Sequence, residues 1–158
     1  MDLLEQRKRT METMAVTGPA HDEALGTLDL VRRYLRAAEL IPPADVELLH
    51  PRCHLYGHAT ELAMKAYLLC RGEKAPRGTD GHDLEGLAAN AIACGLQLTD
   101  HQRSNVVPNL NTIYFENAAS ERYSSRYPHP GTHIWLTPAT VWMGDLIRSI
   151  AAQASALL

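Results

Sequence analysis

The feature that most constrains the fold is an uninterrupted helical pattern over residues 51–72. Pro51 suits the first turn of a helix, because the N–H that proline lacks would have no partner there. Gly72 suits the position just after a helix, where the backbone often turns left-handed. The sequence therefore predicts one long helix in the middle of the chain.

The acidic and basic side chains of this helix, from residue 54 to residue 70, are His54, His58, Glu61 and Lys65. At about 100° per residue, all four fall within a sector of roughly 60°. The residues around this polar stripe are apolar or uncharged. One side is expected to face the core and consists of Leu55, Ala59, Leu62, Ala63, Ala66, Leu69 and Cys70. A second side is expected to face another helix or a subunit and consists of Tyr56, Thr60, Met64 and Tyr67.

The polar stripe has two interpretations that need no ligand. Glu61 and Lys65 have the i,i+4 spacing of a helix-stabilising ion pair, which an ordinary solvated face also shows. Alternatively, His58, Glu61 and Lys65 form a hydrogen-bonded network that is covered by a long loop and supports a site. Glu61→Ala separates the two, because only a buried network loses substantial stability when one charge is removed.

A metal site is a third interpretation. His54 and His58 lie one turn apart, so both imidazoles can reach one ion, and Glu61 follows on the same sector. Zinc could recruit His129 or His133 from the loop that follows later in the chain. The Glu-x-x-His order of carboxylate-bridged di-metal bundles is absent, because here the histidine comes first.

The remaining helical patterns predict an all-α protein. Further helices are expected over residues 3–14, 21–40, 83–95, 99–117 and 138–158, with Pro108 kinking or splitting the fourth of them. A chain of 158 residues is expected to form one domain, with a core over about residues 20–158. Short connections favour an antiparallel four-helix bundle with an extra N-terminal helix. Residues 118–137 show no helical period and predict a long ordered loop before the last helix.

The composition of the chain limits the cellular location and the binding partners that we expect for this protein. The formal net charge of -3 gives no support to nucleic-acid binding through bulk charge. Three cysteines without a CxxC pair indicate reduced thiols, as in a cytoplasmic protein. The start of the chain lacks the apolar core of a secretory signal, and no apolar run approaches the roughly 18 residues of a membrane span. We therefore expect a cytoplasmic protein with no membrane association.

Two stretches of the chain form a pattern in combination, namely "HATELAMKAYLL" at residues 58–69 and "GHDLEGLAANAIACGL" at residues 81–96. Together they resemble the HEPN superfamily of all-α bundles. Many members carry a helix of the form Glu-apolar-x-x-Lys-x-x-Leu, followed by "HDL" at the start of the next helix. The resemblance extends over about residues 52–129, roughly half of the chain.

The resemblance implies a function and a pair of catalytic residues. Catalytic members are metal-independent endoribonucleases that use an Arg, four to six further residues and a His, with the sites of two subunits facing each other. Arg122 and His129 have six residues between them. The guanidinium can hold a phosphate, and the imidazole can move a proton from and to the reacting oxygens. The resemblance therefore implies a homodimer that binds RNA or a nucleotide and needs no cofactor.

A second function remains open at this point. Arg126 and Tyr127 belong to "RYP", which is similar to a motif of non-catalytic HEPN-like proteins. In that interpretation Arg122 and Arg126 anchor the loop, and the chain is a protein-interaction module with an antitoxin-like partner. In the catalytic interpretation Arg126 and Tyr127 shape the pocket.

Overall fold

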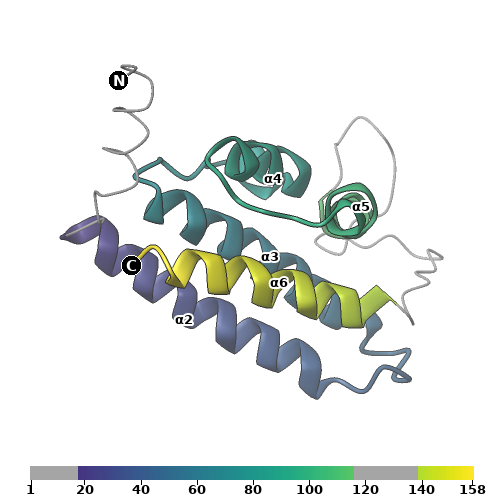
Figure 1. Cartoon of the computed structure of the whole chain (residues 1–158). Coiled ribbons are helices and arrows are strands. Elements are labelled where there is room, and N and C mark those ends of the chain that lie inside the picture. The colour runs from purple at the N-terminus through teal and green to yellow at the C-terminus, as the bar shows by residue number, and fades with distance from the viewer. Residues whose placement is uncertain (1–17, 116–138) are drawn as a thin grey trace.

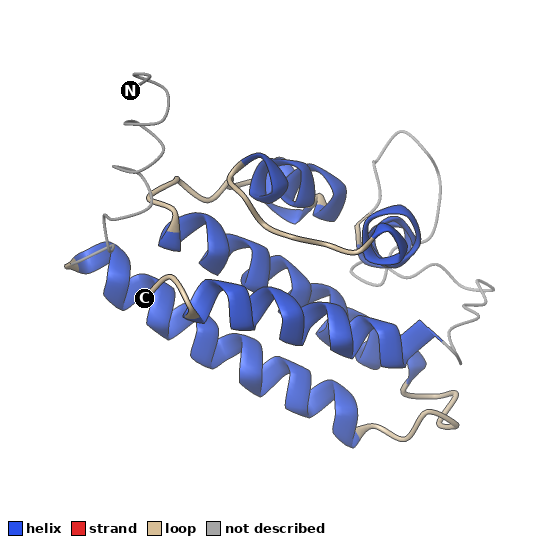
Figure 2. Ribbon diagram, in the orientation of Figure 1, coloured by secondary structure: helices blue, strands red, loops and turns tan. Residues whose placement is uncertain are grey.

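The computed structural model describes residues 18–115 and 139–158. The predicted N-terminal helix over residues 3–14 and the predicted loop over residues 118–137 lie outside these ranges. The α-helices of the described residues are α2 (Pro19–Leu40), α3 (Leu49–Cys70), α4 (Leu84–Ala93), α5 (Val107–Tyr114) and α6 (Ala139–Ser155). A 3₁₀ turn, η1 (Thr79–His82), precedes α4, and a π-helical segment, η2 (Gln102–Val106), precedes α5. These ranges contain no strand, so the all-α prediction is confirmed (Figure 2).

The long helices α2, α3 and α6 lie side by side, and the shorter helices α4 and α5 pack on α3 (Figure 1). The short connection between α2 and α3 makes these two helices antiparallel, and α6 contacts both of them. Helices α4 and α5 pack on α3 and contact each other, and Figure 1 shows α5 nearly end-on. The arrangement is a helical bundle around α3. Its assignment to the four-helix HEPN-like type stays a prediction.

Helix α3 is buried on more sides than its sequence pattern predicts. The side expected to face a helix or subunit, represented by Tyr56, Met64 and Tyr67, is at most 4% exposed. Of the expected core side, Leu55, Leu62 and Leu69 are only partly buried, whereas its other members, Ala59, Ala63, Ala66 and Cys70, are buried. Both expected sides therefore pack against other helices, because α3 contacts α2, α4, α5 and α6 and has no single core-facing side.

Local sequence signals place most helix ends correctly. The carboxylate of Asp83 accepts a hydrogen bond from the backbone N–H of Glu85, which caps α4. Gly72 follows α3 with a φ of 76°, a conformation that glycine adopts without strain. Thr99 and Gln102 exchange side-chain and backbone hydrogen bonds of 3.0 and 3.1 Å in a capping box.

Two helix boundaries differ from the expectation. Helix α3 begins at Leu49, so Pro51 lies within its first turn instead of opening it. The helix expected over 99–117 contains the π-helical segment η2, in which the N–H of Val107 bonds the carbonyl of Gln102. Pro108 follows this segment after Val107, in the first turn of α5. The irregular hydrogen bonding thus falls next to a proline, which has no N–H to donate to the regular hydrogen bonds of an α-helix.

The core consists of apolar side chains from all five α-helices. Cys53 and Cys70 are buried and Cys94 is half-buried, and all three are free thiols. Burial raises the pKa of the Cys53 thiol to about 12, so this thiol stays protonated at neutral pH. In the part of the chain that the structure describes, no helix combines the length and apolar character needed to cross a membrane.

Candidate functional site

The carboxylate of Glu61 is the centre of a buried polar network. Glu61 lies in the middle of α3 and is only 2% exposed. The Lys65 ammonium group, one turn further along the helix, donates a hydrogen bond of 2.7 Å to Oε1. The Lys65 side chain is itself 18% exposed, so the pair lies near the edge of the core. The interpretation of the stripe as a solvated face is therefore wrong for Glu61.

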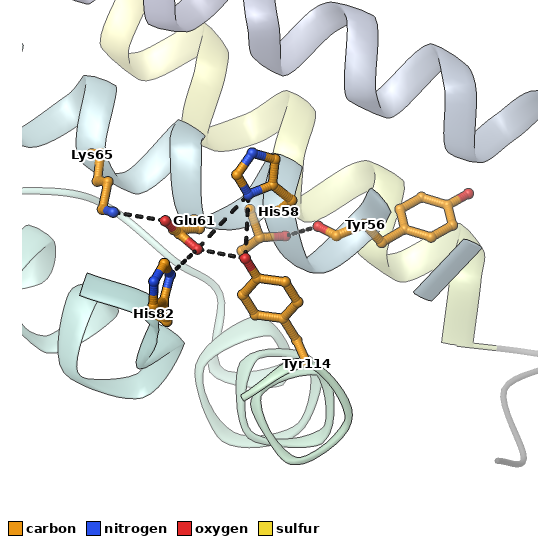
Figure 3. Close-up of polar contacts among 7 residues, drawn as sticks. Tyr56, His58, Glu61, Lys65, His82 and Tyr114 are labelled. Atoms are coloured by element: carbon orange, nitrogen blue, oxygen red, sulfur yellow. Dashed lines mark hydrogen bonds and ion pairs between the residues drawn. The ribbon is translucent and has the colours of Figure 1, made fainter. Parts of the chain in front are cut away.

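Two residues from other elements bind the second oxygen of Glu61 (Figure 3). The hydroxyl of Tyr114, at the end of α5, donates a hydrogen bond of 2.6 Å to Oε2. Nδ1 of His82, at the end of η1, lies 3.0 Å from the same oxygen. A single carboxylate thus joins α3, η1 and α5.

His58 closes the network on the side of α2. Its Nδ1 lies 3.3 Å from the Tyr114 hydroxyl and 3.9 Å from Oε2 of Glu61. The edge of its ring meets the Tyr34 ring of α2, with centroids 4.5 Å apart. His54 stacks nearly parallel to His58, with centroids 6.1 Å apart. The four residues of the stripe therefore lie beside packed elements, and His54 and His58 contact aromatic rings.

The surroundings of Glu61 keep its carboxylate charged. Burial acts to raise the pKa of Glu61, but the interactions with His58, Lys65, Tyr114 and His82 act in the opposite direction and outweigh it. The pKa is therefore held well below its usual range. The network contains a permanent negative charge over the whole neutral range.

Glycine and asparagine make this packing possible. A Cβ on Gly57 would lie 2.6 Å from Cβ of Tyr114, so the absence of a side chain at this position admits the tyrosine. Asn111 of α5 accepts a hydrogen bond of 2.8 Å from the backbone N–H of Leu84. Its amide nitrogen also donates to the carboxylates of Asp83 and Glu85, each at 3.1 Å. Asn111 thereby fixes the start of α4, next to η1, against α5.

Among the side chains of the network, the imidazole of His82 has a clear chemical capacity. The carboxylate of Glu61 favours a proton on Nδ1 of His82, which leaves Nε2 as the acceptor. The His82 side chain is 32% exposed, so this ring reaches solvent. The arrangement can orient an imidazole and hold a negative charge behind it.

The sequence prediction identified part of this network. His58, Glu61 and Lys65 were expected together, and the structure brings them together. Their role as support for a site stays a prediction. The other predicted site residues, Arg122, Arg126, Tyr127 and His129, lie outside the described residues. The network is covered by η1 and α5 in the described ranges, whereas the long loop expected to cover it lies outside them.

Sequence reasoning missed the two residues that complete the network. His82 was visible only as part of a helix start, and its place in the "HDL" motif is the signal that could have identified it. Tyr114 carries no local signal, because its partner Glu61 lies 53 positions away. Both contacts depend on how η1 and α5 pack on α3.

A metal centre finds no support in the described residues. Within residues 18–115 and 139–158, no group of three or more His, Cys, Asp or Glu side chains is arranged to hold an ion. Glu61 already receives hydrogen bonds at both oxygens.

The comparisons with known proteins leave the family open. No protein-family model, no curated protein and no solved structure matches the chain.

Proposed function

We propose that the chain is a HEPN-like protein that binds RNA or a nucleotide and acts as a metal-independent endoribonuclease. The observation that supports this proposal is the contact between its two motifs. Glu61 and Lys65 come from the "HATELAMKAYLL" stretch, and His82 comes from the "GHDL" stretch. Their side chains meet directly at Glu61, as expected if both motifs serve one function.

In this proposal the catalytic groups are Arg122 and His129. Arg122 holds the scissile phosphate and stabilises the charge that develops on it. His129 accepts the proton of the 2′-hydroxyl and returns a proton to the leaving oxygen. A homodimer places two such pairs opposite each other, and no metal takes part.

The network around Glu61 has a supporting role. It fixes Tyr114, at the end of α5, and the segment that carries Arg122 and His129 follows α5 directly. In this proposal the fixed end of α5 positions the segment that carries the catalytic pair. Arg126 and Tyr127 of the same segment shape the pocket.

The test is cleavage of a mixed-sequence RNA in EDTA by the wild type and by His129→Ala. We expect the wild type to cleave and the variant to lose at least about a hundredfold in rate, the usual contribution of a general acid or base. His133→Ala is the matched control, since it removes a histidine from the same segment. Equal rates for wild type and His129→Ala would exclude the assigned role of His129.

A second candidate is a non-catalytic module that contacts another protein. It is favoured by the first turns of α6, where Val141 is 67% and Trp142 is 47% exposed. Exposed aromatic side chains are frequent anchors of protein interfaces. A folded wild type that leaves RNA intact in the same assay would favour this candidate.

A further inference from the structure

A cavity of about 290 Å³ lies on a different part of the bundle from the Glu61 network. It is lined by residues from the last turn of α2, the connection that follows it, the first turns of α3 and the first three turns of α6, among them Glu39, Arg52, Tyr56, Thr140 and Arg148. Its volume is just below the roughly 300–1,000 Å³ of typical ligand pockets. The cavity therefore has room for a small ligand.

Arg52 brings a buried positive charge to this cavity. The residue is only 5% exposed. Its Nε donates to the carbonyl oxygen of Ala38 at 3.3 Å, and its Cζ lies 5.5 Å from the centroid of the Tyr56 ring. No carboxylate of the described residues forms an ion pair with it. Since buried charges are normally paired, Arg52 has the capacity to bind an anion.

Arg148 adds a second guanidinium to the cavity. Its Nη2 forms an ion pair with Glu39, and its Nη1 lies 3.5 Å from Asp145. Since Arg148 already pairs with two carboxylates, the guanidinium of the lining that has no carboxylate partner among the described residues is that of Arg52.

Thr140 and Tyr56 bring two neutral hydroxyl groups to the lining. Thr140 is 4% exposed, and its hydroxyl makes no hydrogen bond to any residue that the structure describes. Tyr56 is 2% exposed. Burial raises the pKa of its hydroxyl, and this effect outweighs the lowering effect of Arg52. Tyr56 therefore keeps its proton at neutral pH and can donate. Thr140 also belongs to the first turn of α6, where backbone dipoles favour negative charge.

We propose that this cavity binds a terminal phosphate group, held by the guanidinium groups of Arg52 and Arg148 and by the hydroxyls of Thr140 and Tyr56. The planar guanidinium fork matches the geometry of phosphate oxygens. A terminal phosphate fits a small cavity between helices better than an internal phosphodiester, because only one side of it continues into the ligand. The site does not depend on the ribonuclease proposal, since it uses none of its residues.

A purely structural role is the alternative for Arg52. Its bond to Ala38 places a cation at the C-terminus of α2, where it would stabilise the helix without any ligand. That role predicts no phosphate binding and no involvement of Arg148 or Thr140.

The test is a calorimetric or NMR titration of the full chain at constant ionic strength. The probes are inorganic phosphate, a 5′-mononucleotide and the corresponding nucleoside. We expect the two phosphate-bearing probes to bind, the nucleoside not to bind, and Arg52→Met to weaken binding by at least about tenfold, as for one lost charge-assisted hydrogen bond. Arg33→Met is the matched control, because Arg33 is exposed on α2 and pairs with Asp29.

Arg148→Met provides a second variant if Arg52→Met fails to fold, since the Arg148 side chain is 52% exposed. It too should weaken phosphate binding, whereas Arg33→Met should not. Comparing a short RNA with and without a 5′-phosphate then distinguishes a strand end from a free nucleotide as the source of the phosphate. Absence of binding to all phosphate-bearing probes, or equal binding by wild type and both cavity variants, would overturn the proposal.

Discussion

The hydroxyl of Tyr114 donates a hydrogen bond of 2.6 Å to Oε2 of Glu61, although 53 positions separate the two residues. The same carboxylate binds Lys65 and His82. One buried charge therefore joins three elements of the bundle.

Removing the carboxylate should destabilise the fold. Glu61→Ala leaves the partly buried ammonium group of Lys65 without its partner and the Tyr114 hydroxyl without its acceptor. We expect the free energy of unfolding to fall by more than about 1 kcal/mol, as measured by urea denaturation. Glu23→Ala, at an exposed position of α2, should change it by no more than about 0.5 kcal/mol. A loss that small for Glu61→Ala as well would mean that the network contributes little to stability.

The carboxylate of Glu61 should make the stability of the fold depend on pH in the acidic range. Its pKa is lower in the folded protein than the value of about 4.3 expected in the unfolded chain. A group with a lowered folded pKa stabilises the fold above its unfolded pKa, and this contribution is lost as the pH falls towards the folded pKa. The free energy of unfolding should therefore decrease below about pH 4.

Glu61→Gln tests the origin of this pH dependence. The neutral amide cannot titrate, so the variant should lose less stability than the wild type between neutral pH and about pH 3. The groups that face the carboxylate are His58, Lys65, His82 and Tyr114. Parallel pH profiles for the variant and the wild type would assign the acid dependence to other carboxylates.

A methyl group at position 57 should displace Tyr114. The Cβ of Gly57→Ala would overlap the Tyr114 side chain, including its Cβ at 2.6 Å. We expect a loss of about 1–3 kcal/mol in the free energy of unfolding, the usual cost of overpacking. Gly26→Ala is the matched control, because a Cβ there meets no atom within 4 Å. In the middle of α2 this control should stabilise the protein by about 0.5–1 kcal/mol.

Asn111 should contribute more to the stability of the fold than Asn109 of the same helix. Asn111→Ala leaves the buried backbone N–H of Leu84 without its acceptor. The expected loss is about 1–3 kcal/mol, the cost of a buried donor that lacks a partner. Asn109→Ala, at an exposed position of the same helix, should have little effect when both are measured by thermal unfolding. Similar losses for the two variants would contradict a specific role for the Asn111 amide.

The helices and most of their ends could be predicted from the sequence, because these depend on short-range interactions. Asp83 and Thr99 cap the helices that follow them through bonds to residues two or three positions away. Gly72 provides the left-handed turn after α3. The pairing of Glu61 with Lys65 is equally local, since one helical turn brings them together. Each of these features is determined by neighbours in the chain.

The surroundings of α3 were decided by tertiary packing. Helical periodicity can indicate one buried side, but α3 is largely apolar and contacts four other helices, so its pattern did not predict that Leu55 and Leu62 are only partly buried. Tyr114 and His82 reach Glu61, and Arg52 and Thr140 meet at a cavity, only because distant elements pack against one another. The sequence alone thus determined the helices and the charged pair, whereas long-range packing decided what surrounds that pair.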